Sequence, residues 1–357
     1  MSDPNQVVYT DRLPGRSLVL DGVEHLFCSG TSYLGIACNK QFRQYLVEGF
    51  CYYGTNYSSS RNSNLQLQVF EEAENYLAAY TGAEAALTMS SGYLAGQTLA
   101  HSLQGSGRFI YAPGTHPALW RSPADAPHPS HDYDAWVAWL LQETPVMPEK
   151  HLVIVTNSLD PLQARKYNFS WVSALPQNKQ ITLIVDDSHG FGVTGQDGAG
   201  IYGQLGHLQQ VRLVVISSMG KALGIPAGII LGDQQLINRL RASSFFGGAS
   251  PAIPAYLYAF LRSEEVFAEA RRQLFHNISF FRQRLDRPEL FRSFADYPVF
   301  STDEQGLYTY LLEHGIIISS FRYPTPSDEP ITRVILSSLH TSEDLERLAL
   351  LINNYKH

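Results

Sequence analysis

The sequence predicts an α/β fold in which a large, doubly wound and mainly parallel sheet is followed by a smaller α+β C-terminal domain. Three short apolar runs, HLVIVTNS, ITLIVDDSHG and VRLVVISSMG, each end in small or polar residues and are separated by enough chain for a helix. Such runs are typical of parallel strands that are buried on both faces. The 357 residues, 44% of them hydrophobic, suffice for a large core and a second domain.

The chain before these runs predicts two helices and a strand. Residues 65–81 carry apolar side chains at helical spacing. The stretch TGAEAALTMSSGYLAGQTLAHSL then passes from a short apolar strand into a second helix. We therefore expect the turn SSGY, at residues 90–93, to be the start of that helix.

The last part of the chain has a different pattern. A helical stretch, SEEVFAEARRQLFHNISFFRQRL, precedes the apolar runs GIIISSFRY and TRVILSSL and the amphipathic SEDLERLALLINNY. Thr341 and Asp344 predict the N-cap and capping partner of that final helix. We expect an N-terminal segment at 1–45 that packs on the small domain, a large domain at 46–262 and a small domain at 263–357.

Composition favours a protein that acts on small molecules. The net charge is −7, and no block rich in Lys and Arg indicates binding to nucleic acid or lipid. The N-terminus lacks an apolar signal region and no apolar run is long enough to span a membrane, so we expect a cytoplasmic protein. Cys28, Cys38 and Cys51 are odd in number and lack metal-binding spacing, which predicts reduced packing residues and no metal site.

Polar residues follow two of the predicted parallel strands. Asp186, Asp187 and His189 come after the second apolar run, and Lys221 lies in SSMGKALGIPAG after the third. Ligands of doubly wound sheets bind beyond the carboxyl ends of the strands. Adjacent carboxylates are costly to bury without partners, so at least one should have a specific partner. A divalent metal ion and a solvated, capped strand end are two alternatives to a catalytic site here.

A carboxylate, a histidine and a lysine at neighbouring strand ends are the protein side of pyridoxal 5'-phosphate chemistry. Lys221 would form the Schiff base, and Asp186 would keep the pyridine nitrogen protonated so that the ring accepts electrons. A phosphate would need backbone N–H groups at a helix start, which SSGY offers, and a hydroxyl donor. The residues predicted to bind the phosphate are Ser91, Gly92, Tyr93 and Ser218.

Five segments together resemble a known family. DDSHGFGVTGQDGAG, SSMGKALG, SSGYLAGQ, GTSYLG and GTHPAL occur in the order found in α-oxoamine synthases, which are fold-type I pyridoxal-phosphate transferases. The resemblance runs from about residue 20 to the C-terminus. It implies a homodimeric enzyme that condenses a small amino acid with an acyl thioester, carried by CoA or a carrier protein, with loss of CO2.

The resemblance also implies roles for individual residues. Lys221 would hold the cofactor and move the α-proton of the substrate, and Asp186 would pair with the pyridine nitrogen. His189 would bond the phenolic oxygen of the cofactor, and His116, in GTHPAL, would stack on its ring. Arg333 would bind the amino acid carboxylate, with Arg322 as an alternative.

Three segments depart from the family pattern, at 54–68, 157–168 and 245–251. In the second, Ser158 is the only nearby hydroxyl for the substrate. In the third, Gly247 and Gly248 stand where the family places Ser or Thr. These departures leave open other reactions on the same fold, namely an aminotransferase, an aldolase-type lyase or a racemase, and also a non-enzymatic relative that keeps the cofactor for stability.

Overall fold

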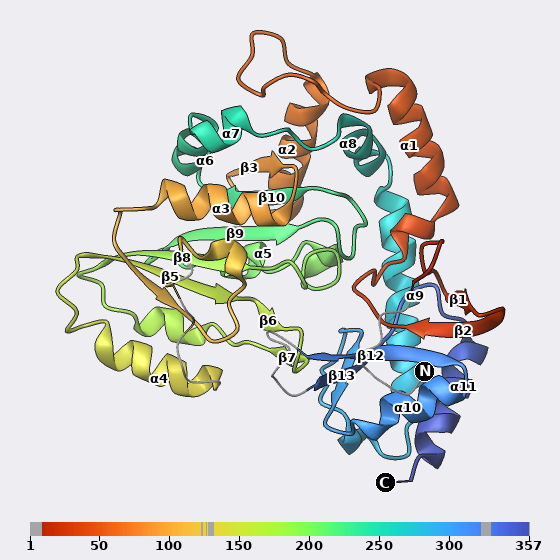
Figure 1. Ribbon diagram of the computed structural model, residues 1–357. Coiled ribbons are helices and arrows are strands. Elements are labelled where there is room, and N and C mark those ends of the chain that lie inside the picture. Colours follow the sequence, from red (N-terminus) through yellow and green to blue (C-terminus); the bar gives the residue numbers. More distant parts are fainter. Residues whose placement is uncertain (1–8, 123, 126, 128–131, 323–329, 357) are drawn as a thin grey trace. The chain divides into compact units, whose positions relative to one another are not determined.

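The computed structural model describes residues 9–122, 124–125, 127, 132–322 and 330–356 (Figure 1). Contacts within the chain divide it into two compact units. The central unit consists of Lys40–Leu159 and Tyr167–Glu264. The terminal unit takes its described residues from Met1–Asn39, Asp160–Lys166 and Glu265–His357.

The described part of the central unit contains a mainly parallel six-stranded sheet (Figure 1). Its strands are, in spatial order, β3 (Ala85–Met89), β10 (Gly228–Gly232), β9 (Arg212–Ser218), β8 (Gln180–Asp186), β5 (His151–Asn157) and β4 (Arg108–Tyr111). Strands β4, β5, β8 and β9 are mutually parallel, while β10 runs antiparallel to both of its neighbours. The prediction that the three apolar runs form buried parallel strands is therefore confirmed.

Helices cover this sheet. Those of the central unit are α1 (Lys40–Tyr53), α2 (Gln68–Thr81), α3 (Gly92–Ser102), α4 (Tyr133–Glu143), α5 (Tyr202–Leu205), α6 (Gln234–Arg241), α7 (Ser244–Gly248) and α8 (Pro254–Leu261). The core between the sheet and helices α3 and α6 contains Leu99, Ile237, Ile184 and Val214, all fully buried. Burial of such side chains is the main stabilising contribution to the unit.

The two predicted helix starts in this unit fare differently. Helix α3 begins at SSGY as predicted, with Ser91 as its N-cap. Helix α2 begins at Gln68, three residues later than the apolar spacing from 65 predicts. The reason is local, because the carbonyl of Leu65 accepts a hydrogen bond from Ser63 Oγ at 2.7 Å and so belongs to the preceding loop.

The terminal unit is built on a five-stranded sheet among its described residues. The strands are, in spatial order, β1 (Ser17–Leu20), β2 (Val23–Cys28), β12 (Ile316–Arg322), β13 (Pro330–Ile335) and β11 (Val299–Thr302). Strand β2 pairs parallel with β12, so that strands from both ends of the chain share one sheet. Helices α9 (Glu264–Arg282), α10 (Gly306–Glu313) and α11 (Ser342–Asn354) accompany it, together with the short strands β6 (Leu159–Asp160) and β7 (Arg165–Lys166).

Two local predictions in this unit can be compared with the structure. The capping box of α11 is present, with Thr341 and Asp344 bonding each other's backbone N–H groups as predicted. The three cysteines are free, but only Cys28 is buried. Cys51 is exposed on α1, so its expected packing role is wrong, because α1 buries Phe42 and Gly49 and leaves Cys51 at the surface. None of the described helices is long and apolar enough to cross a membrane.

Candidate active site

The lysine and the acidic residue singled out in the sequence lie at the carboxyl edge of the central sheet. Asp186 is the last residue of β8, and Ser218 is the last residue of the adjacent parallel strand β9. Lys221 lies in the turn after β9. Two backbone hydrogen bonds close this turn, from Met219 N to Ala227 O at 2.9 Å and from Ile225 N to Met219 O at 3.0 Å. The lysine is therefore held at the strand end by a closed loop.

Lys221, Asp186 and His116 are close enough to influence one another's charge. Burial lowers the pKa of the Lys221 amine, and the Asp186 carboxylate opposes this shift. Loss of surrounding water also lowers the pKa of His116, with Asp186 opposing and Lys221 adding to the effect. A lysine with a lowered pKa is neutral more often at physiological pH, which makes it a better nucleophile and base.

His116 is exposed at the start of a short helical turn at Pro117–Leu119. Its Nδ1 accepts a hydrogen bond from the N–H of Ala118 at 3.1 Å, so the proton of the neutral ring lies on Nε2. The Asn157 side chain donates to the carbonyl of Gly114 at 2.9 Å and ties this loop to the end of β5. The edge of the ring meets Tyr93, with the two centroids 6.4 Å apart.

The turn after β8 orients Asp186. The N–H of Ser188 donates to Asp186 Oδ1 at 2.9 Å, and Ser188 Oγ in turn accepts from the N–H of Ser218 at 2.9 Å. These two bonds link the ends of β8 and β9 and fix the carboxylate. His189 is half-buried in the same turn. Sequence reasoning missed the roles of Ser188 and Asn157, whose only signal was their position at or just beyond the end of a strand.

The helix start at SSGY packs directly on the end of β9. A Cβ atom added at Gly92 would lie 2.7 Å from the Cβ of Ser218, and one added at Gly228 would lie 2.3 Å from the carbonyl oxygen of Ser91. Real Cβ atoms do not approach so closely, so these two positions require glycine. The close approach brings the first turn of α3 beside Ser218.

That first turn offers free backbone donors. The first four N–H groups of a helix have no partner within the helix. Ser91 Oγ accepts from Leu94 N at 3.1 Å, which leaves the N–H groups of Gly92 and Tyr93 available. Gly92 and Gly228, where the chain segments approach closely, form a glycine cradle. The positive end of α3, the Ser218 hydroxyl and this cradle together suit a phosphate group. With Lys221 and Asp186 at the same edge, the residues present fit pyridoxal phosphate.

The second carboxylate of the pair has a different environment. Asp187 is buried, and its Oδ2 accepts from the N–H of Ile201 at 2.9 Å. Burial raises its pKa to about 7; the Ser158 hydroxyl and the Ile201 N–H oppose the rise, and the Asp186 charge adds to it. Among the described residues neither Asp187 Oδ1 nor Ser158 Oγ has a hydrogen-bond partner of good geometry. The structure thus places Ser158 beside a buried carboxyl group.

The two arginines predicted to bind substrate lie in the terminal unit and differ in burial. Arg333 is buried on β13, where its Nη1 donates to the carbonyl of Pro161 at 3.0 Å and burial lowers its pKa. Arg322, the last residue of β12, is exposed. The rest of the predicted substrate segment, residues 323–329, lies outside the described residues.

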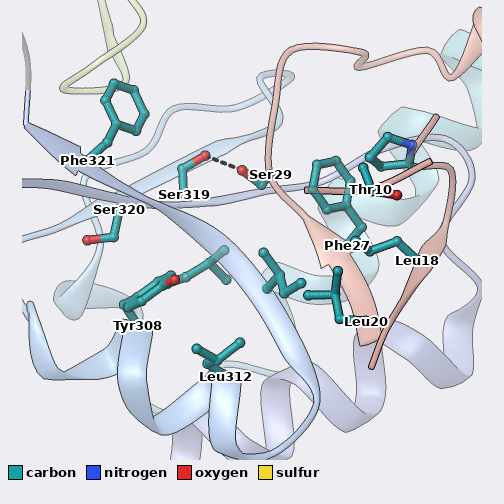
Figure 2. A pocket seen from close by; sticks show the side chains of 13 residues that line it. Thr10, Leu18, Leu20, Phe27, Ser29, Tyr308, Leu312, Ser319, Ser320 and Phe321 are labelled. Carbon is teal, nitrogen blue, oxygen red and sulfur yellow. Dashed lines mark hydrogen bonds between the residues drawn. The ribbon is translucent and has the colours of Figure 1, made fainter. Parts of the chain in front are cut away.

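The described part of the terminal unit also contains a cavity of about 330 Å³, shown in Figure 2. Leu18, Leu20 and Phe27 line one side, and Tyr308 and Leu312 of α10 line another. Ser29 and Ser319 meet at its wall, with their hydroxyl oxygens 2.7 Å apart. The residues that line this cavity include no Asp, Glu, His, Lys or Arg.

Two of the segments that depart from the family pattern contact each other. Ser60 Oγ donates to the carbonyl of Gly247 at 2.6 Å, and the Asn62 side chain donates to the carbonyl of Arg241 at 3.2 Å. Between them Arg61 pairs with the buried carboxylate of Glu74 at 3.1 Å. The unusual residues of the first and third segments therefore form one hydrogen-bonded structure.

Comparison with known proteins identifies the family. Residues 55–352 match the pattern of the aminotransferase class I and II family. The chain belongs to that family, in its α-oxoamine synthase branch. The 8-amino-7-oxononanoate synthase of Chromobacterium violaceum is 30% identical over 349 residues, covering 94% of this chain and 90% of the relative. The 8-amino-7-oxononanoate synthase of Azoarcus sp. strain BH72 is 29% identical over 356 residues, which cover 96% of this chain and 90% of the relative.

Solved structures of this family share the fold. Sphingomonas wittichii serine palmitoyltransferase aligns with a TM-score of 0.81 at 19% identity, covering 98% of this chain and 92% of the other. The 8-amino-7-oxononanoate synthase of Francisella tularensis aligns with a TM-score of 0.70 at 21% identity, covering 92% of this chain and 97% of the other. The fold is thus that of fold-type I pyridoxal-phosphate transferases. This α-oxoamine synthase is a pyridoxal-phosphate-dependent transferase.

Proposed function

We propose that the enzyme condenses an amino acid with an acyl thioester and releases CO2 to give an α-amino ketone. The observation that carries this proposal is the cluster of Lys221, Asp186 and His116 at the sheet edge. These three residues interact electrostatically beside the glycine cradle. Relatives of 29–30% identity named 8-amino-7-oxononanoate synthase support the same reaction class. The thioester carrier is CoA or a carrier protein.

Pyridoxal phosphate, when bound, supplies a ring that stabilises negative charge at the α-carbon of the amino acid. Lys221 holds the cofactor and moves the α-proton, because burial keeps its amine at a lowered pKa. Asp186, fixed by the Ser188 N–H, holds a proton on the pyridine nitrogen. His189 would bind the phenolic oxygen of the cofactor, and His116 would pack against its ring.

The remaining predicted residues bind the phosphate and the substrate. Gly92 and Tyr93 donate their free N–H groups to the phosphate, and Ser91 and Ser218 complete its site. Arg333 binds the carboxylate of the amino acid as a bidentate donor. Arg322 and Ser158 remain secondary candidates for substrate contact, since Arg322 is exposed and Ser158 faces the buried Asp187.

The cofactor assignment is tested by chemical labelling. The protein is loaded with pyridoxal phosphate, reduced with borohydride and mapped by peptide mass spectrometry. We expect the label on Lys221 and its loss in Lys221→Ala. The exposed Lys150 serves as the matched control, because Lys150→Ala should leave the label in place. A label on any other lysine would refute the assignment.

The reaction class is tested by product analysis. The loaded enzyme is mixed with glycine, L-alanine or L-serine and with acyl-CoAs of several chain lengths. A synthase releases free thiol and CO2 in equal amounts, because the thioester is cleaved as the carbon–carbon bond forms and the carboxylate then leaves. Transamination, racemisation or aldol cleavage without thiol release would contradict the proposal.

We also propose that the enzyme is a homodimer in the cytoplasm. Apolar side chains on the surface of the central unit support self-association, namely Val47, Tyr52 and Leu65. Light scattering should give a mass about twice 39.9 kDa. The division of the chain at 1–45, 46–262 and 263–357 stays a prediction, which limited proteolysis would test.

A further inference from the structure

A loop of the central unit closes on the buried carboxyl group of Asp187. This residue directly follows β8, and it is only 1% exposed. Its Oδ2 accepts a hydrogen bond at 2.9 Å from the N–H of Ile201, which lies 14 positions later in the chain. Its backbone N–H donates to the carbonyl of Ile216 on β9 at 2.8 Å. Asp187 therefore ties both ends of the loop 188–200 to the sheet.

Two glycines of the loop pack against the two oxygens of this carboxyl group. A Cβ atom added at Gly190 would lie 2.1 Å from Asp187 Oδ1, and one added at Gly200 would lie 2.1 Å from Oδ2. Real Cβ atoms do not come so close, so glycine is required at both positions. Because the backbone encloses the carboxyl group, a smaller side chain at Asp187 would leave a cavity and an unpaired N–H.

The middle of the loop is ordered by further hydrogen bonds. The N–H of Gly192 donates to the carbonyl of Gly198 at 2.8 Å. The hydroxyl of Tyr80 on α2 donates to the carbonyl of Asp197 at 2.6 Å. These bonds give the loop a defined shape, so its position depends on where its two ends are fixed.

This ordered loop packs on the turn that carries Lys221. Gly192 has a φ of 89°, and a Cβ atom added there would lie 2.9 Å from the Cβ of Ala222 and 3.0 Å from Cδ2 of Leu223. Ala222 and Leu223 directly follow Lys221 in the chain, and each is 2% exposed. The backbone of the loop thus touches the lysine turn, and a displaced loop would open that turn to water.

We propose that Asp187 is a positioning residue, which closes the loop 188–200 and thereby holds Gly192 against the turn of Lys221. The buried place of the lysine amine then depends on a carboxyl group that is assigned no contact with cofactor or substrate. The same group fixes the chain directly after Asp186, the predicted partner of the pyridine nitrogen. This inference rests on the proposed function, in which Lys221 holds the cofactor.

The chain offers a conservative replacement for this group. Burial raises the pKa of the Asp187 carboxyl to about 7, so a neutral amide of the same shape is close to the native group. The amide oxygen of Asn can still accept the hydrogen bond from the N–H of Ile201. We therefore expect Asp187→Asn to keep the loop closed and Asp187→Ala to release it.

The test measures how well Lys221 is shielded from water. The full chain without cofactor is labelled with an amine-specific reagent over a range of pH, and the exposed Lys150 in the same sample is the reference. Burial lowers the Lys221 pKa, so wild type should be labelled there at lower pH than at Lys150. Asp187→Ala should raise the labelling pH of Lys221 by about one unit, and Asp187→Asn should leave it unchanged. Removal of a negative charge would lower this pH, so a rise reports lost packing.

A second readout and a second variant use the same loop. Asp187→Ala should bind pyridoxal phosphate about tenfold more weakly, as followed by the cofactor's absorbance, because an enclosed hydrogen bond is lost. Asp187→Asn should bind it as wild type does. Gly192→Ala keeps Asp187 but pushes the loop away from Ala222, so it should raise the labelling pH of Lys221 even if Asp187→Ala does not fold.

A matched control removes a carboxylate from the opposite end of the same sheet. Asp233 caps α6 by accepting from the N–H of Leu236 at 2.7 Å, and it pairs with Arg212 at the start of β9. Asp233→Ala should lower stability to denaturant but leave the labelling pH of Lys221 unchanged. An equal shift in this control would overturn the inference, because general destabilisation would then explain it.

Two other results would also overturn the inference. One is an unchanged labelling pH of Lys221 in both Asp187→Ala and Gly192→Ala, and the other is a shift in Asp187→Asn equal to that in Asp187→Ala. Labelling of the cofactor-free chain does not depend on the reaction catalysed. If borohydride labels Lys221 but the labelling pH is unchanged in these variants, the inference fails while the cofactor assignment stands.

Discussion

The sheet edge of the central unit and the Arg333 site of the terminal unit differ in how the chain builds them. The central site comes from short segments that each follow a strand, so that Asp186, Ser188 and His189 are close in sequence as well as in space. The Arg333 site joins distant segments, since Pro161, whose carbonyl accepts a hydrogen bond from Arg333, lies far from it along the chain. A site built from residues close in sequence can be recognised as a motif in the sequence. A site built from distant segments cannot.

The two sites also differ in how their charges can change. In the central site burial lowers the pKa of Lys221 and of His116, and the Asp186 carboxylate opposes both shifts, so the site contains groups suited to proton transfer. In the terminal unit the buried charge of Arg333 is a guanidinium, which stays protonated at any accessible pH. We infer that the central unit carries out the chemistry and that the terminal unit supplies a permanent charge for binding.

The largest expected effect would separate the two sites most clearly. Replacing Lys221 with Ala removes the group proposed to hold the cofactor and move the proton, and turnover should fall by more than about 10³-fold. Arg333→Lys should mainly raise KM instead. Steady-state assays of thiol release, with circular dichroism to confirm folding, measure both variants. A Lys221→Ala enzyme with undiminished turnover would remove the contrast.

A smaller effect tests the coupling within the central site. Asp186→Asn should lower turnover about 10²-fold, because the pyridine nitrogen loses its proton partner. Since the Asp186 charge raises the Lys221 pKa against burial, its removal should lower that pKa further. The pH at which Lys221 of the cofactor-free protein begins to react with an amine-specific reagent should then fall. Asp286→Asn, at an exposed position, should leave both measurements unchanged.

A substitution in the glycine cradle should have a smaller effect, on cofactor binding and on stability. Gly92→Ala places a Cβ 2.7 Å from the Cβ of Ser218, so the start of α3 must move away from β9. We expect pyridoxal phosphate to bind about tenfold more weakly, with a loss of about 1–3 kcal/mol in unfolding free energy. Cofactor titration and thermal unfolding measure these changes. Gly206→Ala, where the nearest atom would lie at an ordinary 3.4 Å, is the control.

The last effect concerns stability and pH. The buried carboxyl of Asp187 has its pKa raised from 3.8 to about 7, so the folded chain binds a proton that the unfolded chain has lost between these values. This group therefore destabilises the fold progressively as pH rises from about 4 to 7. Asp187→Asn removes the titration, and its free energy of unfolding relative to wild type should rise over that range by an amount on the order of a few kcal/mol, as measured by denaturant unfolding at several pH values. A difference in free energy that is constant with pH would contradict the assigned environment.

The difference between local and distant contacts explains which features could be predicted from the sequence alone. The buried strands β5, β8 and β9, the start of α3 and the capping box of α11 follow from local patterns of apolar and capping residues, and all are confirmed. The environment of Asp187 and the neighbours of Arg333 depend on which distant segments pack together. The sequence predicted that at least one of Asp186 and Asp187 would have a specific partner, but nothing local showed which would be buried.

The antiparallel strand β10 has a consequence for how the enzyme can change over time. Gly228, its first residue, lies opposite Met89 on one side and Ser218 on the other. An insertion or deletion that slipped this strand by one place would bring the bulky Ile229 against the turn at Ser91. The spacing between Ser218 and Gly228 should thus resist length variation, and substrate diversity among related enzymes would have to arise in other loops.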